Sequence, residues 1–136
     1  MRRLRHIVFW LMAACTPWLA CGAAEAADVF VIASQPIVLS ADDIKDVFLG
    51  EVQFAGATRL APMDNGSVQA EFLERVMKMT PARYAAWWTK KSFRDGVNSP
   101  PVRAGDAQVL IFVKETPGGI GYVSSPPAGV HVIGKF

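Results

Sequence analysis

The residues best suited to chemistry are Asn65, Gly66 and Ser67, which stand between an apolar stretch and a helical pattern. Gly66 frees the backbone, Ser67 supplies a hydroxyl, and the N–H groups of Val68 and Gln69 open the first turn of the following helix. Backbone donors, a hydroxyl and the positive end of a helix dipole together can cradle an oxyanion. Because serine at this place is also a common helix cap, capping and anion binding both stay open.

The elements that must position this group alternate between strand and helix patterns. The continuous apolar run at 29–33 predicts a strand covered on both faces, and 58–62 predicts a second strand. Between them, Ser40 can cap a helix that ends at Gly50 and buries Ile44, Val47 and Phe48. A helix is also expected to begin at Asn65-Gly66-Ser67, with a buried stripe at Phe72, Leu73 and Val76.

The second half of the chain continues the alternation. Thr80 followed by Pro81 predicts the start of a helix that carries Tyr84, Trp87 and Trp88, and Asp106 can cap another that ends before Pro117. Residues 120–124 and 130–133 are expected to be short strands. We therefore predict an α/β fold with a mostly parallel sheet flanked by helices. In such sheets ligands gather at the carboxyl ends of strands. Ser34, after the first strand, is a candidate to face the same ligand as Ser67, and an ordinary solvated loop serine is the alternative.

Residues 1–26 have the layout of a secretory signal peptide. Three arginines precede an apolar run, and a small-residue region ends at Ala26. The alternatives are an uncleaved membrane anchor or a lipoprotein acylated at Cys21. We expect a cleaved signal, a periplasmic location and one domain at 27–136, since about 110 residues suit one core.

Once residues 1–26 are set aside, the charge and cysteine content of the remaining chain indicate which partners and cross-links to expect. Three of the fourteen basic residues and one of the twelve acidic residues lie in 1–26, which leaves eleven of each and no net charge. Nucleic acid is therefore not an expected partner. Both cysteines also lie in the segment, so no disulfide framework is expected.

Catalytic and metal-binding groups are not assembled in the sequence. His131 alternates with two valines and is expected to point outward from a strand, and Ser67 lacks the Gly-x-Ser-x-Gly pattern of hydrolases. Asp42, Asp43 and Asp46 fit the first turns of a helix, where the dipole favours acids, and no cysteine or second histidine joins them. We expect no enzyme activity, no cofactor and no metal.

Four segments in this order resemble one lobe of the substrate-binding component of phosphate ABC transporters, which has a type II periplasmic binding protein fold. They are 29–33, 44–50, Asn65-Gly66-Ser67 and 117–123. The resemblance covers nearly all of 27–136 and corresponds to the middle lobe of a full-length family member. Trp87-Trp88, Phe93 and Ser99-Pro100-Pro101 resemble short, single-lobe relatives of that family.

The resemblance implies phosphate or another small oxyanion as the ligand. The family's site reads Arg, any residue, Asp, Gly, Ser, Gly, Thr, and here Gly66 and Ser67 match it. The four departures are Met63, Asn65, Val68 and Gln69, which stand where the family has Arg, Asp, the second Gly and Thr. Loss of the arginine removes a charge-assisted contact worth about 1.5–3 kcal/mol, so weak binding is expected.

A second hypothesis keeps the fold and discards the ligand. Trp87 and Trp88 are adjacent on a helix, so they cannot both face the core squarely, and one is expected to be partly exposed. That end is then a contact surface for an envelope protein or for a second copy of the chain.

Overall fold

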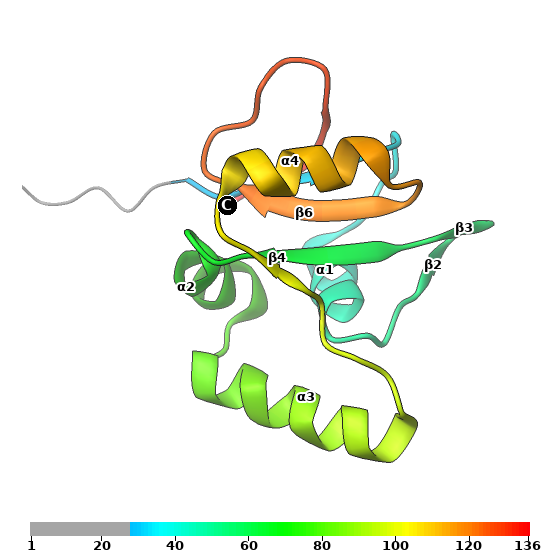
Figure 1. The fold of residues 1–136 in the computed structure, drawn as a ribbon, viewed down its shortest axis with the longest axis vertical. Coiled ribbons are helices and arrows are strands. Elements are labelled where there is room, and N and C mark those ends of the chain that lie inside the picture. The colour runs from blue at the N-terminus through cyan, green and yellow to red at the C-terminus, as the bar shows by residue number, and fades with distance from the viewer. Residues whose placement is uncertain (1–27) are drawn as a thin grey trace, which may run out of the picture.

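One five-stranded sheet forms the centre of the domain (Figure 1). The computed structural model describes residues 28–136, so the predicted signal at 1–26, with Cys21, lies outside the described residues. The strands are ordered β5-β4-β6-β1-β7. Their bounds are β1 (Phe30–Ala33), β4 (Ala61–Asn65), β5 (Val102–Arg103), β6 (Gly119–Val123) and β7 (His131–Lys135).

The direction of β1 corrects one part of the predicted sheet. β4 pairs in parallel with both β5 and β6, whereas β1 pairs antiparallel with both β6 and β7. Four strands therefore run in one direction and β1 runs in the other. The α/β class is confirmed, but the sheet is mixed, because the apolar run that identifies β1 carries no information on its direction.

One face of the sheet is covered by α4 (Asp106–Glu115). Val109 and Val113 of this helix pack with Ile32 and Met63 in a small apolar cluster. Gly121 on β6 permits the close approach, because a Cβ there would lie 2.6 Å from the Val109 side chain.

The other face packs against α1 (Ala41–Phe48), α2 (Gln69–Phe72) and the π-helical turn η1 (Leu73–Met77). Ser40 caps α1 as predicted and forms a capping box with Asp43. At the centre of this layer the Phe72 and Tyr122 rings stack with centroids 3.8 Å apart, and Phe48 packs edge-on against Phe72.

Helix α3 (Pro81–Asp95) begins at the predicted Thr80 cap and lies at the outer edge of the domain, farther from the sheet than α2 (Figure 1). Tyr84 and Trp88 reach inward from it and are buried. The remaining pair of strands, β2 (Phe54–Ala55) and β3 (Thr58–Arg59), forms a separate hairpin. Within residues 28–136 the helices are all too short or too polar to cross a membrane.

Candidate functional site

The predicted anion loop is organised by Asn65, whose amide group is fully engaged inside the protein. Its Nδ2 donates to Asp106 Oδ1 (2.7 Å) and to the Tyr122 carbonyl oxygen (3.0 Å). Its Oδ1 accepts from the Ser67 N–H (3.0 Å) and the Ser67 hydroxyl (2.7 Å). An amide has two donor hydrogens and two acceptor lone pairs, so Asn65 is saturated. The Ser67 N–H and hydroxyl are both directed at Asn65.

Asp106 brings a negative charge to the same end of the sheet. Its carboxylate accepts from the Ser124 hydroxyl (2.6 Å), the Ser124 N–H (3.1 Å) and the Ser125 N–H (3.3 Å), besides Asn65. Partial burial raises the pKa of Asp106, but these hydrogen bonds outweigh it and leave the pKa below its usual value. The donors that follow β4 and β6 therefore already bind an anion, which is the chain's own carboxylate.

The start of α2 also differs from the prediction. Val68, not Ser67, is the N-cap residue, and its N–H donates to the Asn65 carbonyl oxygen (3.2 Å). Gln69 begins a helix that keeps α-geometry for only four residues before the π-turn. Serine capping is therefore wrong, because the Ser67 hydroxyl turns back to Asn65 instead of forward into the helix.

Ser34 and Ser67 lie at opposite ends of the sheet, so the expectation that they face one ligand is wrong. The Ser34 N–H donates to the Gly119 carbonyl oxygen (2.9 Å), and Gly119 is paired with Ala61, at the amino end of β4. Ser67 follows the carboxyl end of β4. The cause is the antiparallel direction of β1. The Ser34 hydroxyl is buried and has no hydrogen-bond partner.

The two adjacent tryptophans hold α3 against α1. Trp87 Nε1 donates to the Leu49 carbonyl oxygen (3.0 Å), and Trp88 Nε1 donates to that of Phe48 (3.2 Å). These carbonyls belong to the end of α1, where helical partners run out. Trp88 is buried and Trp87 is half-buried, as the helical spacing predicts. Both indole N–H groups are thus satisfied within the chain.

A second polar group, which the sequence analysis missed, surrounds Asp64. Its side chain is 1% exposed, and its Oδ2 and Oδ1 accept from the hydroxyls of Tyr84 (2.8 Å) and Tyr122 (2.9 Å). Burial raises the pKa of Asp64 to about 6, although the two hydrogen bonds act in the opposite direction. Burial and the Asp64 charge raise the pKa values of both tyrosines, which therefore keep their protons and remain donors.

Asp64 lies on the wall of a cleft of about 680 Å³ between α3 and the edge of the sheet. The cleft is an open groove at the surface and not an enclosed cavity. No lysine, arginine or histidine lines it; its walls are Asp64, Gln69, Tyr84, Ala85, Trp88, Thr89, Ser92, Phe93, Ser99, Pro100 and Val102. A neighbouring cleft of about 620 Å³, lined in part by residues 96–101, has no acidic residue in its walls.

Asp64 lies beyond the strand predicted at 58–62, whereas β4 runs on to Asn65 and buries it, so the predicted pattern does not point to this acid. Its tyrosine partners are 20 and 58 residues away, and the pattern gives no sign of their approach. Among residues 28–136 no group of three or more metal-ligating side chains is assembled. Comparison with models of protein families and with curated proteins finds no match.

Proposed function

We propose that this chain is an exported binding protein of the solute-binding type, resembling one lobe of the substrate-binding component of phosphate transporters. It binds its ligand in the Asp64 cleft and does not catalyse a reaction. The observation that carries the proposal is a buried carboxylate with no cationic partner on the wall of an open cleft. Strongly perturbed acids in clefts are frequent at functional sites.

The loop at Ser67 supports phosphate binding less well than the cleft supports binding of another ligand. The Ser67 donors are directed at Asn65. The carboxylate of Asp106, which contacts Asn65 at 2.7 Å, would repel an arriving oxyanion. Phosphate could enter only by displacing the Asp106 carboxylate from Ser124, whose N–H and hydroxyl both donate to it.

Binding fits the cleft better than catalysis does. The two groups in contact with Asp64 are tyrosines whose raised pKa values keep them protonated, so neither is a nucleophile at neutral pH. The nearby Thr89 hydroxyl donates to the Ala85 carbonyl oxygen (2.9 Å) and contacts no base. A nucleophile must also be reachable by a substrate, and Tyr84 and Tyr122, whose hydroxyls contact the Asp64 carboxylate, are both buried.

An amide chemical-shift titration of residues 28–136 tests this proposal. A panel of anionic, neutral and cationic small solutes, phosphate included, is added in the millimolar range. We expect at least one class to move the amides of Thr89 and Ser92, and phosphate to leave those of Gly66 and Ser67 in place. The Ala85→Trp variant, which fills the cleft mouth, is expected to abolish the cleft response. A phosphate response centred on Ser67, or no response in the cleft to any class, would contradict the proposal.

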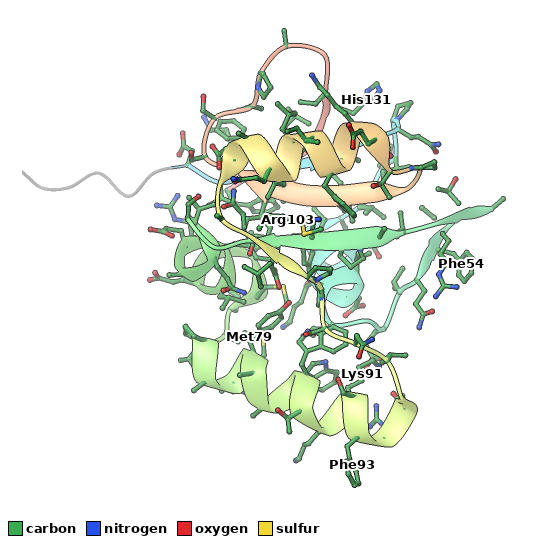
Figure 2. The ribbon with its side chains drawn as sticks, viewed as in Figure 1. Phe54, Met79, Lys91, Phe93, Arg103 and His131 are labelled. Carbon is green, nitrogen blue, oxygen red and sulfur yellow. The ribbon has the colours of Figure 1, made fainter. Side chains whose placement is uncertain are left out.

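A second candidate is the interaction module that docks an envelope protein or a second copy of the chain. Trp87 and Trp88, which were expected to carry it, are engaged with α1. The observation that favours this candidate is instead Phe93, which is 96% exposed and projects outward from α3 at the rim of the Asp64 cleft (Figure 2). Sedimentation of wild type and Phe93→Ala over a concentration series tests self-association. If wild type stayed monomeric at every concentration, docking of a second copy of the chain would be excluded as the function.

Export is part of the proposal and rests on residues 1–26, outside the described part of the chain. The mass of the protein recovered from the periplasmic fraction tests it. Cleavage near Ala26 supports the proposal, and an intact N-terminus would indicate a membrane-anchored form.

A further inference from the structure

We propose that the ligand of the Asp64 cleft is a small organic cation, an amine with an apolar body, whose charge neutralises the Asp64 carboxylate. The inference rests on the proposed function, because it takes the cleft to be the binding site. It names the chemical class of the ligand from the charge of Asp64 and from the residues that line the cleft.

The first step concerns the missing positive charge. A carboxylate removed from water is ordinarily paired with a cation, because its desolvation is costly. Asp64 is faced by a tyrosine from α3 and a tyrosine from β6, both neutral. Lys91, the buried lysine of α3, is paired with Glu51 (3.1 Å) and Asp95 (3.3 Å). Arg103, on the adjoining strand β5, is exposed and is not among the residues that line the cleft. A cation from solution would supply the charge that these groups do not.

The second step concerns hydrogen bonding. An ionised carboxylate offers about four lone-pair positions, and the two tyrosines use one on each oxygen of Asp64. An ammonium group, which has three donors and no acceptor, matches the remaining positions, and because Asp64 is 1% exposed it reaches them only if side chains of the cleft wall move aside. A bare metal ion needs several such ligands together, and the cleft wall offers one carboxylate.

The third step concerns the body of the ligand. Trp88 and Tyr84 are the buried aromatic residues of the cleft wall, and Ala85, Pro100 and Val102 are its aliphatic residues. Aromatic rings attract cations through their negative faces. An anion would meet the Asp64 charge with no basic side chain in the walls to offset it.

Protonation of Asp64 competes with the ligand. The groups that face it, Tyr84 and Tyr122, do not titrate near neutral pH, so the titration belongs to Asp64 itself, with a pKa of about 6. The ionised fraction falls about tenfold between pH 7 and pH 5, and the affinity for a cation is expected to fall about tenfold with it.

Three probes of similar size and different charge test the class of ligand: butylammonium, 1-butanol and butyrate. Each is titrated into residues 28–136 at pH 7 and at pH 5, and binding is followed at the Thr89 and Ser92 amides. Butylammonium stays cationic at both pH values. We expect it to bind at least tenfold more tightly than either other probe at pH 7, and to lose about tenfold in affinity at pH 5.

Two variants locate the interaction. Asp64→Asn removes the charge and is expected to lose the preference for butylammonium, whereas Asp42→Asn, on the exposed first turn of α1, is the matched control and is expected to keep it. Ala85→Trp leaves Asp64 in place and is expected to block all three probes, which keeps the test valid if Asp64→Asn does not fold.

The outcomes separate the two proposals. If 1-butanol or butyrate moves the cleft amides as strongly as butylammonium, the cation is the wrong class while the cleft remains the binding site. Equal affinity for butylammonium at the two pH values also overturns the cation proposal. If neither these probes nor the wider panel of solutes moves a cleft amide, the cation proposal and the proposed function both fail.

Discussion

The Asp64→Asn variant is expected to be more stable than wild type above pH 6 and equally stable near pH 4. Burial raises the pKa of Asp64 from 3.8 to about 6. The folded state therefore binds more protons than the unfolded state between these values, and wild-type stability falls as the pH rises through this window. At 1.36 kcal/mol per pKa unit, the loss is about 3 kcal/mol, undiminished by solvent because Asp64 is 1% exposed. Asparagine resembles the protonated acid, since its amide can accept from one tyrosine and donate to the other.

Urea unfolding followed by tryptophan fluorescence measures this difference. Trp87 and Trp88, the tryptophans within 28–136, both lie on α3, close to the site. Other acids have lowered pKa values and destabilise the fold below about pH 4, so the comparison is made from pH 4.5 to 8. If the free energy of unfolding of wild type and of Asp64→Asn changed with pH in parallel over this range, the claim that Asp64 is a buried carboxylate with a raised pKa would be refuted.

Three further variants test the loop and the sheet. Asn65→Asp places a second carboxylate against Asp106 and removes the amide that donates to it. The variant is therefore expected to lower the free energy of unfolding by about 2–4 kcal/mol. Unchanged urea unfolding would contradict the Asn65–Asp106 contact. Asp106→Ala frees the Ser124 N–H and hydroxyl, so this variant is expected to bind sulfate with millimolar affinity, measured by calorimetry. Absence of binding heat in the variant would show that these donors do not form an anion site. Gly118 has φ +74°, and a Cβ at this position would clash with the Arg59 carbonyl oxygen, so Gly118→Ala is expected to lose more than about 2 kcal/mol in thermal unfolding; an unchanged melting temperature would contradict this close approach.

Local signals predicted the helices well, because caps act over three or four residues. Ser40 and Thr80 begin α1 and α3 as expected, and each side chain accepts from the backbone N–H three residues on. The prediction was less accurate at Asp106, which lies inside α4 after the cap residue Gly105. Its side chain crosses to Ser124, a partner that no local pattern identifies.

The predicted site was wrong mainly in how its residues come together, and to a smaller degree in where α2 begins. Ser34 follows a strand and Ser67 precedes a helix as expected, but the direction of β1 separates them. Strand direction depends on pairings with residues 120–123 and 131–135, far along the chain. Asp64 was missed for a related reason. Asp64 is a candidate site residue because it is buried and bound by two tyrosines that are distant in the sequence, and these contacts can be identified only once the pairing of the strands is known.

The central claim is that Asp64 is a buried, uncompensated carboxylate that an organic cation neutralises. The most direct test is a carbon-13 NMR titration of the Asp64 carboxyl group in residues 28–136, without and with saturating butylammonium. We predict a pKa of about 6 in the free protein and a clearly lower pKa with the amine, because the cation favours the ionised form. A pKa near 3.8 in the free protein, or the same pKa in both conditions, would contradict the claim.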